Sequence, residues 1–168
     1  MRAPIVLFFT FVIAGCATPR IVPPPAPVGT PPPSPAPPPL AADWRDWPMM
    51  PGTWTYARGA DGSTASFGQA GADALAKLRC VGGRMILSVR PAGNGPISIR
   101  TSSVTRTVAA EPTSGSPADL AATLAATDPL LDAMAFSRGR FALSAAGAAP
   151  LVLPAWAEVG RVVEDCRN

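Results

Sequence analysis

LAKLRCVGGRMILSV, residues 75–89, is the most regularly patterned stretch of this 168-residue chain. Apolar side chains alternate with polar ones on both sides of the pair Gly82-Gly83. The apolar positions are Ala76, Leu78, Cys80, Met85, Leu87 and Val89. Alternation with a period of two is typical of a strand that buries one face, and a Gly-Gly pair suits the tight turn of a hairpin. The stretch therefore predicts two antiparallel strands, over residues 75–81 and 84–89.

Similar alternation predicts further strands on either side of this hairpin. They are expected over residues 53–58 and 63–68, from residue 97 onward, and over residues 104–109, 140–144 and 150–153. Trp54 and Tyr56 would share one face of the first of these strands, and Ala65 and Phe67 one face of the second. Residues 119–127 are rich in Ala and Leu and fit either a strand or a helix.

Two short helices are expected late in the chain. Asp128-Pro129 has the residue types preferred at the N-cap and first position of a helix, which predicts a helix over residues 130–137. Pro154 precedes a second helix over residues 155–166, whose inward face would consist of Trp156, Val159, Val163 and Cys166. The predicted fold class is mainly β with minor α. We expect a compact antiparallel β-sandwich or half-open barrel with two short helices in its C-terminal half.

The N-terminus has a different character. Arg2 precedes an apolar run, residues 5–13, that fits a secretory signal and is shorter than the roughly 20 residues a membrane-spanning helix needs. The run ends in Ile13-Ala14-Gly15-Cys16, which resembles the lipobox of bacterial lipoproteins. The resemblance implies that residues 1–15 are a signal peptide and that Cys16 is acylated, with chains such as palmitate holding the protein at a membrane. The alternative is an incidental Cys16 in a signal that is removed whole.

The segment that follows Cys16 indicates at which membrane the protein is held and how far the domain can reach from it. Ala17 is not the Asp that retains lipoproteins at the inner membrane, so the resemblance implies the periplasmic face of the outer membrane, with the inner membrane as the alternative. Residues 16–42 read as the lipidated Cys and a disordered Pro-rich tether, because such a run favours polyproline II and cannot bury a core. At about 3.1 Å per residue, it would reach about 80 Å. A PxxP ligand is the alternative role.

Residues 43–168 are expected to form a single globular periplasmic domain. The net charge of +3 includes Arg2 and Arg20, and without these two it is +1, so the domain lacks the basic surface that nucleic-acid binding needs. In an exported domain, Cys80 and Cys166 lie on inward faces and are expected to form a disulfide. Two buried free thiols are the alternative. Neither a cofactor nor a metal is expected, since the chain has no His and no further Cys for a metal site.

The absence of His also excludes Ser/His/Asp and Cys/His catalysis. Lys77, the sole Lys, is expected on the outer face of a strand. Asp128 and Asp132 are better explained by the start of a helix than by catalysis, while Glu164 and Asp165 are expected to be solvated. We therefore predict no enzyme activity and no catalytic residues.

Two groups of side chains are candidates for binding. Arg138 and Arg140 flank Gly139 and could hold an anion or a partner's carboxylate, unless they cap the preceding helix or pair with acidic residues. Trp44, Trp47 and Trp54 lie near the tether and could form a platform for sugar rings, although large rings more often seal the edge of a core.

These observations predict a membrane-anchored envelope lipoprotein with a non-catalytic binding or structural domain. Its partners would be the membrane, through Cys16, and cell-wall glycan or another envelope protein. The stretch Cys80-Val81-Gly82-Gly83-Arg84-Met85 is similar to the Cys-turn-strand of small lipoproteins that inhibit lysozyme, which implies an inhibitor module as the alternative. A second alternative is an enzyme with an unrecognised carboxylate site. The domain as a whole resembles uncharacterised bacterial envelope proteins, which implies no activity.

Overall fold

The computed structural model describes residues 39–115 and 118–168. The signal peptide, Cys16 and all but the last residues of the Pro-rich segment lie outside the described residues. Within the described residues, no helix is long and apolar enough to cross a membrane.

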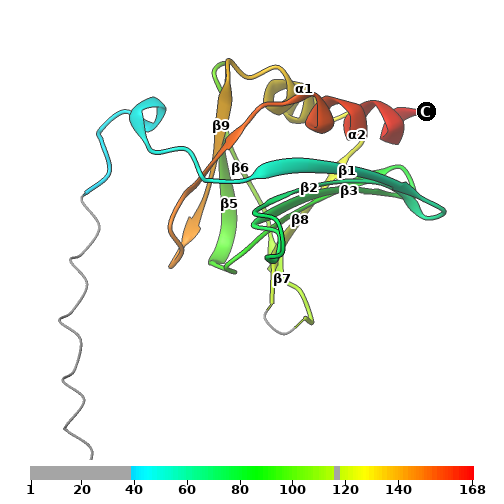
Figure 1. The fold of residues 1–168 in the computed structure, drawn as a ribbon, viewed down its shortest axis with the longest axis horizontal. Coiled ribbons are helices and arrows are strands. Elements are labelled where there is room, and N and C mark those ends of the chain that lie inside the picture. The colour runs from blue at the N-terminus through cyan, green and yellow to red at the C-terminus, as the bar shows by residue number, and fades with distance from the viewer. Residues whose placement is uncertain (1–38, 116–117) are drawn as a thin grey trace, which may run out of the picture. The chain divides into compact units, whose positions relative to one another are not determined.

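The described strands form two antiparallel sheets, which Figure 1 shows meeting at an angle. Sheet A has the order β1-β2-β3-β4-β8-β7, and sheet B the order β10-β9-β5-β6. The strands are β1 (Thr53–Gly59), β2 (Gly62–Gly68), β3 (Ala76–Val81), β4 (Arg84–Val89), β5 (Asn94–Arg100), β6 (Thr105–Val108), β7 (Glu111–Pro112), β8 (Leu120–Ala125), β9 (Arg140–Ala146) and β10 (Leu151–Pro154). Neither sheet closes into a barrel. The predicted fold class is therefore confirmed.

The β3–β4 hairpin forms as its alternation predicts. Leu78 pairs with Leu87 and Cys80 with Met85 across the two strands, and all four side chains are buried. Gly82 and Gly83 have φ angles of 55° and 71°, which residues with a side chain rarely adopt. This hairpin occupies the middle of sheet A, with β2 paired to β3 and β8 to β4.

The ambiguous stretch 119–127 forms a strand, β8. Its residues Leu120, Ala122 and Leu124 are buried and alternate with more exposed residues. β8 pairs with β4 over its whole length. This pairing decides between helix and strand, because the Ala-rich and Leu-rich composition does not.

Helix α1 (Pro129–Ala135) starts where Asp128-Pro129 predicts. The Asp128 side chain accepts a hydrogen bond from the backbone N–H of Leu130 at 2.9 Å, and Pro129 is the first helical residue. The helix ends two residues before its predicted end, at Ala135. The buried side chains of α1 are Leu130, Leu131 and Met134.

Helix α2 (Ala157–Arg167) packs on sheet A, mainly over β2 and β3, and runs beside α1 (Figure 1). Its buried residues are Val159, Val162, Val163 and Cys166. The prediction that Trp156 belongs to this inward face is wrong. Trp156 has extended backbone angles at the N-cap and is 45% exposed. Val162 takes its place on the buried face.

A disulfide joins the strand hairpin to the last helix. Cys80 of β3 and Cys166 of α2 are bonded, with their Cα atoms 5.4 Å apart. The prediction that these two cysteines pair is confirmed. The bond holds α2 against sheet A at the end of the chain.

The N-terminal strap, residues 43–50, covers the outer face of sheet B. It contains a short 3-10 helix, η1 (Trp44–Asp46), which the sequence did not predict. The Trp44 ring packs on Ala142 and Val152, outside the main core. The backbone N–H of Met50 donates to the carbonyl of Val152 at 2.9 Å. The strap therefore adds a second, smaller hydrophobic layer to the four-stranded sheet.

Candidate functional site

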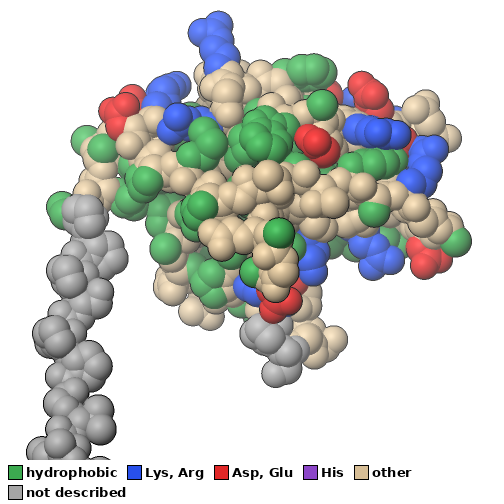
Figure 2. All heavy atoms as spheres, in the orientation of Figure 1, with side chains coloured by type: hydrophobic (Ala, Val, Ile, Leu, Met, Phe, Trp, Pro, Cys, Tyr) green, Lys and Arg blue, Asp and Glu red, His purple; other side chains and the backbone are tan. Residues whose placement is uncertain are grey.

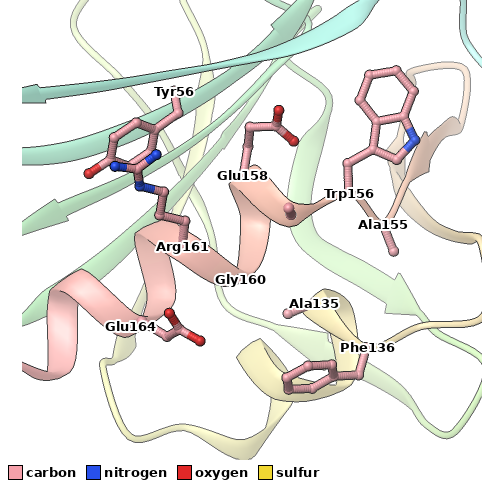
Figure 3. Close-up of a pocket in the computed structure, with 10 residues that line it drawn as sticks. Tyr56, Ala135, Phe136, Ala155, Trp156, Glu158, Gly160, Arg161 and Glu164 are labelled. Atoms are coloured by element: carbon pink, nitrogen blue, oxygen red, sulfur yellow. The ribbon is translucent and has the colours of Figure 1, made fainter.

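A groove of about 690 Å³ opens where α1 meets the start of α2 (Figure 3). Its lining residues come from β1, the end of α1, the segment after β10, and α2. They are Tyr56, Ala135, Phe136, Ala155, Trp156, Ala157, Glu158, Gly160, Arg161 and Glu164. A volume in this range is typical of small-molecule sites.

Two aromatic rings stand on opposite sides of this groove. Figure 3 shows Phe136 at the end of α1, next to Ala135, and Trp156 just before α2, next to Ala155. Phe136 is 77% exposed and Trp156 45%, although large apolar side chains are usually buried. The chain brings them together because Phe136 caps the C-terminus of α1 and Trp156 caps the N-terminus of α2. Both rings are therefore available to a ligand.

Small residues line the groove where the two helices approach each other. A Cβ atom added at Gly160 would meet only the Cβ of Ala135, at 3.8 Å, which is ordinary van der Waals contact. The groove thus remains open because neither helix places a large side chain there.

Polar groups line the β1 side of the groove. The Arg161 guanidinium lies over the Tyr56 ring, 4.2 Å from its centroid, and Figure 3 shows the two side chains stacked. The Tyr56 hydroxyl in turn donates to Asp165. This arrangement holds Arg161 in place at the rim.

Asp165 is not solvated as predicted, because its carboxylate accepts hydrogen bonds from Tyr56 and Arg58. The Tyr56 hydrogen bond is the main reason that the pKa of Asp165 lies below its ordinary value, with burial opposing it. Asp165 therefore ties β1 to α2 and stays charged at neutral pH.

The remaining carboxylates give no converging pair at the groove. Glu158 and Glu164 line it, but Figure 3 shows their carboxyl groups pointing in different directions. Asp128 caps α1 and pairs with Arg106 at 2.6 Å, and Asp132 pairs with Arg167 at 2.9 Å. Among the described residues, no group of three or more His, Cys, Asp or Glu side chains could hold a metal ion.

The predicted tryptophan platform does not form. Trp54 is buried in the main core and its indole N–H donates to the carbonyl of Pro154 at 2.8 Å. Trp44 is buried on sheet B, and Trp47 is half-buried beside it with its indole N–H bonded to Ala41. These rings seal hydrophobic layers, as large rings usually do.

The structure instead brings Trp44, Arg138 and Arg140 together in a second pocket. Arg45 and Ser102 complete its lining, and its volume is about 310 Å³. Neither Arg138 nor Arg140 forms an ion pair with a carboxylate among the described residues. The alternative that they pair with acidic residues, namely Asp128, Asp132 or Glu164, is not what the described residues show, because Arg106 and Arg167 pair with Asp128 and Asp132.

Sequence reasoning missed the two aromatic rings of the groove. Trp156 was assigned to the core because its spacing from Val159 fits one helix face. Phe136 received no role, although a signal was present. It follows Met134 by two residues, which on a helix turns a side chain about 200° away from the buried face. A large apolar residue there is expected to be exposed.

Comparison with known proteins identifies no relative of this chain: no family model, curated protein or solved structure matches it.

Proposed function

We propose that this protein is a lipid-anchored protein of the bacterial envelope that binds cell-wall glycan in the groove between α1 and α2. The observation that supports this most strongly is the pair of exposed rings, Phe136 and Trp156, on opposite sides of a groove of about 690 Å³. Both exposed rings border a groove that is otherwise lined by several small residues, and each offers an apolar face to a flat, rigid ring.

Sugar rings match the chemistry of this groove. The C–H face of a sugar packs on an aromatic ring, while its hydroxyl and amide groups need hydrogen-bond partners at the edge. Glu158 and Glu164 provide acceptors at the rim, and Arg161 provides donors. Because the groove carries both signs of charge, a ligand rich in neutral polar groups suits it better than a strongly charged one.

Cell-wall glycan is also the ligand that the expected location would bring within reach of the domain. The lipobox-like stretch ending at Cys16 would hold the chain at the periplasmic face of the outer membrane. The tether would let the domain reach about 80 Å from that membrane, which is far enough to meet the cell wall. The proposal therefore joins an anchor, a spacer and a glycan-binding domain, without a catalytic step.

Cosedimentation of the full chain with purified cell-wall sacculi tests the groove. We expect the wild type to sediment with sacculi and Phe136→Ala to bind about tenfold or more weakly, as for an aromatic hot spot. Val104→Ala is the matched control, because Val104 is also exposed but does not line the groove. Failure of the wild type to bind, or equal loss in both variants, would overturn the proposal. Retention of an envelope protein by the groove, in place of glycan, would also contradict it.

Membrane fractionation tests the anchor separately. Cys16→Ser should release the protein from membranes, because no acyl chain can then be attached to residue 16. Continued membrane attachment of this variant would refute the lipobox assignment. Binding of this variant to sacculi should equal that of the wild type, since glycan binding depends on the groove.

A further inference from the structure

The second pocket, which we call the arginine pocket, is lined by Trp44, Arg45, Ser102, Arg138 and Arg140. It lies between the N-terminal strap, the loop after β5, and the turn that connects α1 to β9. Figure 2 shows Lys and Arg side chains gathered over this part of the surface, near η1 and the start of β9. Three guanidinium groups thus line one pocket of about 310 Å³.

Two arginines of this pocket, Arg138 and Arg140, differ from the arginines of the domain that have carboxylate partners. Arg58, Arg90, Arg106 and Arg167 each form an ion pair with a carboxylate at 3.0 Å or closer. The Arg138 side chain forms no hydrogen bond or ion pair among the described residues, and Arg140 bonds only carbonyl oxygens there. Arg138 and Arg140 carry like charges that no carboxylate offsets among the described residues, so the pocket is suited to receive an anion.

The pocket is also built to hold its shape. Nη1 of Arg140 donates to the carbonyls of Arg45 and Trp47, at 3.0 and 3.1 Å, which leaves its other donors available. The Arg45 guanidinium lies over the Trp44 ring, 5.2 Å from its centroid. These contacts orient two guanidinium groups before any ligand arrives, which lowers the entropy lost on binding.

Ser102 contributes a further donor. Its Oγ accepts a hydrogen bond from the backbone N–H of Arg138 at 3.0 Å, and its own N–H donates to Ser137 Oγ at 2.9 Å. An Oγ that accepts from the protein can still donate its hydroxyl proton. The hydroxyl therefore completes a set of donors around the pocket.

The charge of the pocket indicates which anion fits. Arg45 pairs with Asp43 at 3.5 Å, and this is the one ion pair that an arginine of the pocket forms among the described residues, so it offsets one of the three positive charges. A surplus of about two positive charges remains, which matches the charge of −1.5 to −2 that a phosphate monoester carries at neutral pH. A single carboxylate would leave one guanidinium uncompensated. Guanidinium forks also suit the paired oxygens of phosphate.

We propose that the arginine pocket is a binding site for a phosphate monoester group. The group can come from a soluble phosphate ester or from a lipid headgroup, since both present the same oxygens. This site is separate from the glycan groove, although the two are neighbours along the chain. Phe136 lines the groove and Arg138 the pocket, two residues further on.

Calorimetric titration of the full chain with inorganic phosphate, at constant ionic strength in chloride, tests the site. We expect saturable binding that Arg138→Gln weakens about tenfold or more, as for loss of a charged hydrogen bond. Arg138 is chosen because its side chain has no hydrogen bond or ion pair within residues 39–115 and 118–168, whereas Arg140 also fastens the strap. Arg79→Gln is the control, since Arg79 is exposed on β3, outside the pocket, and should bind as the wild type.

Three results would overturn the proposal. They are absence of saturable phosphate binding, equal weakening in Arg79→Gln and Arg138→Gln, and acetate binding as tight as phosphate binding. Phe136→Ala should bind phosphate normally, so failure of the glycan groove and failure of this site are distinguishable.

Vesicle flotation separates the two sources of the phosphate group. The Cys16→Ser chain, which lacks the acyl anchor, is mixed with phosphatidylcholine vesicles with and without phosphatidic acid. Flotation that needs phosphatidic acid and is lost in Arg138→Gln assigns a lipid headgroup. Saturable binding of inorganic phosphate without this preference assigns a soluble phosphate ester. Flotation that Arg138→Gln leaves unchanged would count against the pocket as a headgroup site.

Discussion

Asp128 meets two partners at the start of α1. One carboxylate oxygen accepts from the N–H of Leu130 at 2.9 Å, and the other accepts from Arg106 at 2.6 Å. The Arg106 hydrogen bond is the largest cause of the lowered pKa of Asp128, the Leu130 bond adds to it, and burial opposes it. A lowered pKa means that the folded state favours the charged carboxylate. Its stabilising contribution is therefore full above the unfolded-state pKa and is lost as the pH falls through the folded-state pKa.

At the residue scale, we expect Asp128→Ala to lower the free energy of unfolding at pH 7 by about 1–2 kcal/mol, mostly through loss of the N-cap. Asp128→Asn should cost less, because Asn caps helices nearly as well as Asp. Urea denaturation measures both. The difference between wild type and Asp128→Asn should shrink below the ordinary Asp pKa of 3.8. A difference that stays constant in acid would contradict the role of the charge.

At the scale of elements, the β1–β2 hairpin contains two glycines that face each other but have different constraints. Gly59 pairs with Gly62 at the end of the hairpin. Gly62 has a φ of 123°, and a Cβ added there would lie 2.2 Å from the carbonyl oxygen of Cys80 in β3. At Gly59 the nearest atom to an added Cβ is 3.9 Å away. Close packing of β2 against β3 therefore needs glycine at position 62 alone.

This contrast gives a paired prediction. Gly62→Ala should lower the free energy of unfolding by about 2 kcal/mol or more, because the backbone is strained and β3 must move. Gly59→Ala, three residues away in the same turn, should change it by less than about 0.5 kcal/mol. Thermal and urea unfolding of the two variants provide the comparison. Equal losses would mean that the approach of β2 to β3 does not exclude a methyl group.

The turn between α1 and β9, residues 136–140, is the element that most affects the two proposed sites. It contributes Phe136 to the groove and both Arg138 and Arg140 to the arginine pocket. The Ser137 hydroxyl donates to the carbonyl of Arg140 and accepts from the N–H of Ser102. Hydrogen bonds within this connection and to the loop after β5 therefore hold it in place while its side chains line both sites.

At the scale of the whole molecule, the Cys80–Cys166 disulfide links elements that are 86 residues apart in the sequence. It fastens the last helix to the middle of sheet A, next to the Tyr56–Asp165 hydrogen bond. Closing a loop of this length restricts the unfolded chain strongly, which is worth about 4–5 kcal/mol in the chain-entropy model. Helix α2, which this bond fastens to sheet A, also forms one wall of the groove.

We therefore expect a double variant, Cys80→Ala with Cys166→Ala, to lose about 4–5 kcal/mol of the free energy of unfolding. Urea denaturation with and without reductant measures the effect. Reductant should lower the unfolding midpoint of the wild type and leave that of the double variant unchanged. If the wild type is unfolded in the presence of reductant and its urea midpoint does not fall, the stabilising role of the disulfide is contradicted.

Much of the fold could be predicted from local patterns. Alternation along residues 75–89, the glycines at their centre and Asp128-Pro129 involve near neighbours in the chain, and local backbone preferences act over that range. The sequence left residues 119–127 open between strand and helix. It also predicted, wrongly, that Trp156 lies on the buried face of the last helix. Strand pairing with β4 decided the first, and the start of α2 after Trp156 decided the second. Neither depends on near neighbours alone.

The sequence by itself determined the fold class, the pairing of Cys80 with Cys166 and the N-cap at Asp128. It also marked Arg138 and Arg140 as candidate binding residues. Only the tertiary structure decided what those arginines face, and that Phe136 and Trp156 stand across a groove. The physical reason is that a binding site is made of side chains from distant elements. Tyr56 and Arg161, or Trp44 and Arg140, lie about a hundred residues apart and meet only after the sheets and helices have packed. Periodicity shows which face of an element is buried, but not which side chains face one another.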